Sequence, residues 1–265
     1  MKLHISPCPN DTFTFHAMIH GLVDTEGLTF DPVFDDIDAL NGAAIRHPED
    51  EEVVKISYAA LPQAAGAFRL LDSGSALGHG NGPLLVCKHK IYPDELSDAL
   101  IGIPGEMTTA NRLLSIVYPE ARRKKTCLFS EIAPAVADGE LDAGVLIHEG
   151  RFTYASLGLR LIADLGQEWE TLTGLPIPLG GILLSRKYSA QTAEQVSRII
   201  RRSIEYARRH PEASAGYVKA HAQELEPEVR QKHISYFVND YSLSLGEEGR
   251  RAVERLTGLT EATWR

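Results

Sequence analysis

His148 is the residue of this sequence best placed for acid–base chemistry. It follows the mainly apolar run 141–147, so it comes at the carboxyl end of a predicted strand. Open parallel α/β sheets bind their ligands at these strand ends. An imidazole has an ordinary pKa of about 6.5 and can exchange protons near neutral pH. The position therefore predicts a general base or acid, with a purely structural histidine as the alternative.

The same rule selects polar residues that follow other predicted strands. Two come after the first strand, two after the third, two in a glycine-rich turn and two in a later loop. They are Asn10, Asp11, Ser57, Tyr58, Gly80, Asn81, Thr108 and Thr109. We predict that these residues bind the substrate.

Ser57, Thr108 and Thr109 each stand where a helix is expected to begin. The free backbone N–H groups of a helix N-terminus bind carboxylates and phosphates well. These positions therefore suit a small anionic ligand, either a carboxylate or a phosphate. Hydroxyl groups at such positions also cap helices, and Asp11 before the first helix is open to the same explanation.

The sequence predicts neither a metal nor an organic cofactor. His16 and His20 are four residues apart, a spacing compatible with metal binding, but no third ligand accompanies them. The glycine-rich turn at 78–82 has neither the order of a dinucleotide-binding loop nor the lysine of a P-loop.

Alternating strand and helix patterns must position these residues. The expected strands are 3–5, 28–34, 53–56, 84–87, 100–103, 126–129, 141–147, 161–163 and 182–184. Asn10 or Asp11 is expected to cap a first helix, Ser130 to cap another, and Thr192 with Gln195 to form a capping box. The Gly- and Pro-rich stretch 174–181 is expected to interrupt the pattern. This order of elements predicts two parallel or mixed sheets flanked by helices.

The alternation runs twice, so we predict an α/β protein of two lobes with a ligand cleft between them. The larger lobe is expected to comprise 1–86 and 182–265, including a helical C-terminal tail, and the smaller lobe 87–181. Two crossings of the chain between the lobes suit a hinged, bilobed receptor.

The amino-acid composition argues against some classes of binding partner. The chain has 265 residues and a net charge of −9, which argues against nucleic acid and anionic membranes. No stretch approaches a membrane span, and no apolar signal segment follows Lys2. The three cysteines are far apart, as in reduced cytoplasmic proteins. The cytoplasm is thus the expected compartment, and the oligomeric state stays open, with a homodimer among the options.

The run Ser-Pro-Cys-Pro-Asn-Asp-Thr-Phe at 6–13, followed by His20-Gly21, resembles the N-terminal signature of the 1,4-dihydroxy-6-naphthoate synthase family. That family acts in the futalosine route of menaquinone biosynthesis. Further matching motifs stand at 55–60, 80–83, 105–110, 147–149 and 176–181, so the resemblance covers essentially the whole chain.

The resemblance implies a fold like that of the type 2 periplasmic binding proteins. It implies a carbon–carbon lyase that converts cyclic dehypoxanthinyl futalosine to 1,4-dihydroxy-6-naphthoate without a metal or cofactor. His148 stands where the family has its proposed base. Ser57 or the Thr108–Thr109 pair would then hold the substrate carboxylate.

Three alternatives stay open. A solute-binding protein for a transporter would have the same fold, since fold does not determine function. The chorismate dehydratase of the same pathway is a second candidate, although the run at 6–13 and the motif at 147–149 favour the later enzyme. The effector domain of a regulator is the third.

Overall fold

The computed structural model describes residues 1–148, 150–222 and 226–265. The chain forms two compact units, which are described separately. Unit 1 comprises Met1–Gly78 and Pro178–Arg265, and unit 2 comprises His79–Ile177. The α/β class predicted from the sequence is confirmed.

The chain passes into unit 2 after Gly78 rather than near residue 86. Strand β6 (Leu84–Cys87) is the reason, because it pairs with β9 (Ala143–Leu146) and β10 (Arg160–Asp164). All three strands are in the second unit. The return to unit 1 likewise comes at Pro178, four residues before the expected position.

The sheet of unit 1 has the order β2-β1-β3-β11-β4, with β5 also paired to β11. Its strands are β1 (Lys2–Ile5), β2 (Asp31–Phe34), β3 (Val53–Ser57), β4 (Phe68–Leu70), β5 (Ala76–Gly78) and β11 (Ile177–Ser185). Strand β1 is parallel to β2 and β3, whereas β11 is antiparallel to β3 and β4. The sheet is therefore mixed, which is one of the two arrangements that the sequence predicted.

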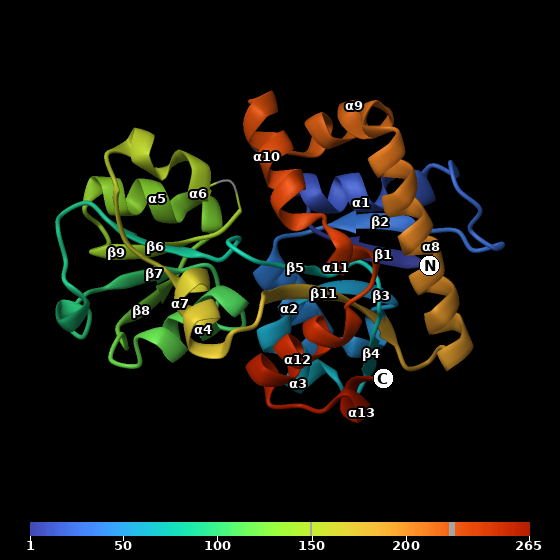
Figure 1. Cartoon of the computed structure of the whole chain (residues 1–265), viewed down its shortest axis with the longest axis horizontal. Helices are drawn as coiled ribbons and strands as arrows, with labels where there is room; N and C mark the ends of the chain where they lie inside the picture. The colour runs from blue at the N-terminus through green and yellow to red at the C-terminus, as the bar shows by residue number, and fades with distance from the viewer. Residues whose placement is uncertain (149, 223–225) are drawn as a thin grey trace. The chain divides into compact units, whose positions relative to one another are not determined.

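Helices cover the sheet of unit 1. They are α1 (Pro9–Ile19), α2 (Ile37–Arg46), α3 (Leu61–Ala64), α8 (Ala190–Arg209), α9 (Pro211–His221), α10 (Pro227–Phe237), α11 (Asp240–Leu243), α12 (Gly246–Thr257) and α13 (Glu261–Trp264), with the 3₁₀ turns η1 (Pro48–Asp50) and η2 (Tyr58–Ala60). Helix α1 lies against α8 and α9 (Figure 1). Apolar side chains such as Phe15, Ile182 and Ile199 fill the core between α1, α8 and the sheet. In the part of the chain that the structure describes, no helix is long and apolar enough to cross a membrane.

Unit 2 has a second mixed sheet, in the order β10-β6-β9-β7-β8. Strand β7 (Ile101–Ile103) is parallel to β8 (Lys124–Thr126) and β9, and β6 is antiparallel to β9 and β10. The other elements of the unit are α4 (Thr109–Val117), α5 (Phe129–Asp138), α6 (Gly150–Thr153), α7 (Leu165–Thr173), η3 (Pro93–Glu95) and η4 (Tyr154–Leu157). Helices α4 and α7 cover one face of this sheet and α5 the other (Figure 1).

Three helices begin at other residues than expected. Cys8 occupies the N-cap position of α1 without a side-chain capping hydrogen bond, so Asn10 and Asp11 lie inside the first turn. Helix α5 begins at Phe129, one residue before the expected cap Ser130. Ser189, rather than Thr192, caps α8, because its Oγ accepts a hydrogen bond from the Thr192 N–H at 3.1 Å.

The stretch 174–181 does not interrupt the pattern, because β11 already begins at Ile177. Its glycines serve close packing within the sheet. A Cβ atom on Gly180 would lie 2.7 Å from the Ile56 carbonyl oxygen, and one on Gly181 would lie 2.9 Å from the Tyr58 hydroxyl. Only a residue without a side chain fits at either position.

Candidate functional site

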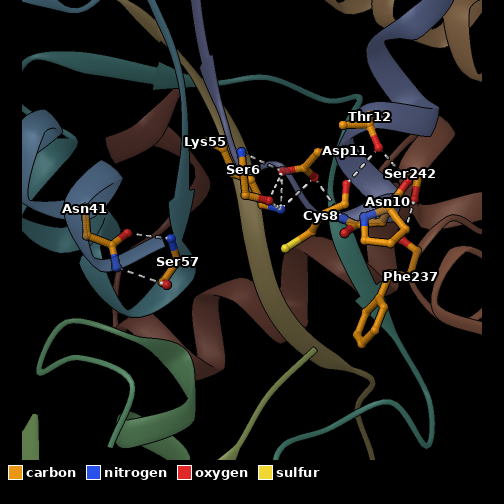
Figure 2. Close-up of polar contacts among 11 residues, drawn as sticks. Ser6, Cys8, Asn10, Asp11, Thr12, Asn41, Lys55, Ser57, Phe237 and Ser242 are labelled. Atoms are coloured by element: carbon orange, nitrogen blue, oxygen red, sulfur yellow. Dashed lines mark hydrogen bonds and ion pairs between the residues drawn. The ribbon is translucent and has the colours of Figure 1, made fainter. Parts of the chain in front are cut away.

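Asp11 is the centre of a buried polar network at the start of α1. Its carboxylate accepts hydrogen bonds from the Ser6 N–H at 3.0 Å and the Ser6 hydroxyl at 2.6 Å. Lys55 Nζ, from the middle of β3, lies 2.6 Å from both carboxylate oxygens (Figure 2). Both partners of this ion pair are buried. Asp11 therefore fixes the turn after β1 to the sheet and does not cap the helix.

Asn10 is attached to the same network. Its side-chain NH₂ group donates to Asp11 Oδ1 at 2.8 Å. The other end of the amide, Oδ1, is buried and has no hydrogen-bond partner among the described residues. Asn10 is thus anchored by its donor and keeps a free acceptor.

Ser57 is held by Asn41, a residue that the sequence did not single out. The Ser57 N–H donates to Asn41 Oδ1 at 2.8 Å, and Asn41 Nδ2 donates to the Ser57 hydroxyl at 3.1 Å (Figure 2). Asn41 comes from α2 and is fully buried. Ser57 ends β3 and precedes η2, but its side chain makes no capping hydrogen bond there. A carboxylate at this point would meet a hydroxyl whose position the asparagine fixes.

Tyr58 lies in the core beneath β11. Its hydroxyl is 2.6 Å from the Ser75 hydroxyl, and its side chain is fully buried. Burial raises the pKa of the phenol above its ordinary value, so Tyr58 stays protonated at physiological pH. Its place in the core suits support of the neighbouring Ser57 more than direct proton transfer.

In unit 2, Thr108 caps α4, as one of the two explanations for this position predicted. Its Oγ1 accepts a hydrogen bond from the Asn111 N–H at 3.3 Å and donates to the Gly105 carbonyl at 2.7 Å. Thr109 is the first residue of the helix and is also buried. Because the Thr108 hydroxyl is used by the backbone, the helix N-terminus itself is the feature that remains for an anion.

The turn that carries Gly80 and Asn81 is held from two sides. The Gly80 N–H donates to Glu170 of α7 at 2.7 Å. Arg151 of α6 donates to the carbonyl of Gly80 at 3.1 Å and to that of Gly82. Arg151 also forms an ion pair with Asp164. These bonds fix the turn next to α6, the helix that follows His148.

His148 occupies the turn after β9, and its backbone is strained. Its φ of +53° is in the left-handed region, which among the described non-glycine residues only Glu26 shares. The ring packs edge-on against Phe129 of α5, with ring centroids 4.9 Å apart. Strained backbone of this kind is concentrated at functional sites. Glu149, the next residue of the motif at 147–149, lies outside the described residues.

Among the described residues, no group of three possible metal ligands lies at the predicted site. Within the described ranges, the one group of three with compatible geometry is His47, Glu49 and Asp50, all exposed. His16 and His20 are not in it; their rings stack on each other, with centroids 4.4 Å apart. The spacing of these two histidines serves packing beside Tyr217.

The sequence-predicted residues are thus divided between the two units. In unit 1, Asn10 and Asp11 are in direct contact, and Ser57 and Tyr58 follow the neighbouring strand β3. Unit 2 contains the others, which are Gly80, Asn81, Thr108, Thr109 and His148. Lys55 and Asn41 were missed, because the only signals were a lysine inside an apolar strand and an asparagine inside a helix.

Comparison with known proteins decides the family. A family model described as menaquinone biosynthesis matches residues 1–262. The chain belongs to this family. A relative from Thermus thermophilus is 43% identical over 99% of this chain and 94% of its own length, and it is named 1,4-dihydroxy-6-naphthoate synthase. A second relative with that name, from Streptomyces coelicolor, is 42% identical over 99% of this chain and 92% of its own length. The resemblance found in the sequence is therefore confirmed.

Solved structures identify the fold of this family member. A crystal structure from Archaeoglobus fulgidus has a TM-score of 0.90 and 35% identity, and the match covers 96% of this chain and 94% of the other. A Candida albicans protein described as having the generic periplasmic binding protein fold has a TM-score of 0.66 at 11% identity. That match covers 98% of this chain and 90% of the other. The predicted fold like that of the periplasmic binding proteins is confirmed.

Proposed function

We propose that the chain is a 1,4-dihydroxy-6-naphthoate synthase, a carbon–carbon lyase that acts on cyclic dehypoxanthinyl futalosine in the cytoplasm. The observation that carries the proposal is full-length identity of 42–43% to two relatives with that name. The N-terminal run at 6–13 supports it, because most of its polar side chains belong to one buried network.

His148 is the proposed general base. Three features support this role: the position after β9, the left-handed backbone, and a ring that Phe129 packs on one side. Proton removal by the imidazole would let a carbon–carbon bond break while the new ring becomes aromatic. Aromatisation supplies much of the driving force, so the protein mainly positions the substrate and moves protons.

The substrate carboxylate is proposed to bind at Ser57 or at the N-terminus of α4 with Thr108 and Thr109. At the first position, Asn41 holds the serine hydroxyl in place. At the second, the first-turn N–H groups of a nine-residue helix provide positive potential. The reaction as proposed uses no metal or organic cofactor.

The test is turnover by purified protein. The protein is incubated with cyclic dehypoxanthinyl futalosine in metal-free buffer, and the product is identified by mass. We expect 1,4-dihydroxy-6-naphthoate, and a loss of at least about 100-fold in kcat for His148→Ala. His47→Ala, which removes an exposed histidine elsewhere, is the matched control and should keep full activity.

Folded wild-type protein that forms no product would overturn the synthase proposal. Tight binding of a small solute without turnover would then favour the solute-binding alternative. Dehydration of chorismate would favour the sister enzyme. Normal turnover by His148→Ala would overturn the assignment of the base alone.

A further inference from the structure

We propose that Asn10 Oδ1 is a hydrogen-bond acceptor for a hydroxyl group of the ligand, and that it selects hydroxylated ligands over otherwise identical ones. The inference rests on the proposed function, because it specifies one contact of the substrate and product of that reaction. It rests on the contacts around α1 and β3 in unit 1.

The orientation of the Asn10 amide follows from its neighbour. Asp11 is paired with Lys55 at 2.6 Å, so its carboxylate is ionised and can only accept hydrogen bonds. The NH₂ end of Asn10 must therefore face Asp11, and the 2.8 Å contact is between these groups. A flipped amide would set two oxygens against each other. The charge on Lys55 thus fixes, through Asp11, where the Asn10 oxygen lies.

Neighbouring protein donors are already used. The Ser6 hydroxyl donates to Asp11, and Lys55 Nζ contacts Asp11 and Ser6. The Thr12 hydroxyl donates to the carbonyl oxygens of Cys8 and Pro9. Among the described residues, nothing donates to Asn10 Oδ1, although Asn10 is only 6% exposed. A buried acceptor without a donor is unfavourable, and a ligand hydroxyl would satisfy it.

The chemistry of this acceptor restricts what can bind there. A carboxylate has no proton to donate and would be repelled by the amide oxygen, so the acid group of the ligand must bind elsewhere. A hydroxyl group supplies the missing donor. The product named in the proposed function carries both kinds of group, since it has two phenolic hydroxyls and one carboxylate.

The test compares two ligands that differ only in their hydroxyl groups. Binding of 1,4-dihydroxy-6-naphthoate and of 2-naphthoate is measured by calorimetry, with air excluded because the diol oxidises to a quinone. The two have the same rings and the same carboxylate position. We expect wild-type protein to bind the diol at least about 10-fold more tightly. In Asn10→Ala this preference should fall to about 2-fold or less.

Two further variants distinguish the loss of the Asn10 acceptor from a general disturbance of the fold. Thr14→Val removes another buried hydroxyl one turn further along α1 and should keep the wild-type preference. Asn10→Ser keeps a hydroxyl close to Asp11 but withdraws the amide oxygen. It should lose the preference as Asn10→Ala does, and it replaces that variant if the alanine protein does not fold.

The proposal is overturned if the wild-type protein binds both compounds equally or binds neither. It is also overturned if the folded Asn10 variants keep the preference. Failure of the proposed function has a different signature, since wild-type protein would then form no product from cyclic dehypoxanthinyl futalosine, whatever the binding ratio.

Discussion

Lys55 Nζ lies 2.6 Å from both carboxylate oxygens of Asp11, and the two residues are 44 positions apart in the chain. Both side chains are buried. The pair connects the turn after β1 to the middle of β3, so it holds the N-terminal motif on the sheet. A charge in such a place is tolerated only while its partner is present.

Removal of one partner should therefore destabilise the protein strongly. We expect Asp11→Asn and Lys55→Met each to lower the free energy of unfolding by about 3–5 kcal/mol, because each leaves one buried charge unpaired. The double variant should lose less than the sum of the two. Urea unfolding of the four proteins measures the coupling, and strict additivity would show that the pair contributes nothing.

Phe129 should affect the proposed reaction through His148. Its ring meets the imidazole edge-on at 4.9 Å, and such aromatic contacts are worth about 0.5–1.5 kcal/mol. We expect Phe129→Ala to lower kcat by about 3- to 10-fold and to shift the pH profile of kcat/KM, because the imidazole loses the ring that orients it. Phe129→Tyr keeps that ring and should retain both. An unchanged pH profile in the alanine variant would contradict the role.

Stability should fall as the pH drops below about 6.5. Burial, and then the neighbouring His20, lower the pKa of His16 from its ordinary value of 6.5; burial also lowers the pKa of His4. In the unfolded chain both groups bind protons more readily, so acid favours unfolding. Their contribution is fully present above pH 6.5 and is lost as the pH falls through the lowered pKa values.

The measurement is the free energy of unfolding in urea at pH 7.5, 6.5 and 5.5. His16→Phe cannot be protonated, so its stability should depend less on pH than that of the wild type. His47→Ala, at an exposed position, should keep the wild-type slope. A wild-type slope in His16→Phe would show that His16 does not contribute.

Two glycines of the turn in unit 2 should differ in their response to alanine. A Cβ atom on Gly82 would lie 2.3 Å from the Gly166 Cα, so Gly82→Ala should cost about 3 kcal/mol through overpacking. Gly80 has open space around it but a φ of +66°, so Gly80→Ala should cost about 1 kcal/mol through backbone strain alone. Thermal unfolding of the two variants measures both losses of stability. Equal losses would refute the distinction between overpacking and backbone strain.

Local patterns in the sequence predicted the fold class and most strands, because alternating apolar runs and helix starts depend on near neighbours. The position of β11 was misjudged, since its glycines look like a loop in the sequence. Gly180 and Gly181 are needed because β3 and Tyr58 approach closely, and that approach depends on residues more than 120 positions away.

The candidate site was predicted as a set of positions, but not as a set of contacts. Placement after strands selected Asp11 and Ser57 correctly as polar groups near strand ends. The partners that determine their chemistry, Lys55 and Asn41, come from other elements and carry no local signal of pairing. Asp11 consequently has a structural role that its position before a helix could not reveal.

The order of strands in unit 1 also determines when this protein can fold during synthesis. Strand β11 lies between β3 and β4, yet the ribosome makes it only after residues 79–177 have been added. The first 78 residues therefore leave the ribosome with the middle of their sheet missing. Unit 2 is one continuous segment and can complete its own core first. The N-terminal motif can acquire its final surroundings only after β11 has been made, so unit 1 is begun first and can be completed only last.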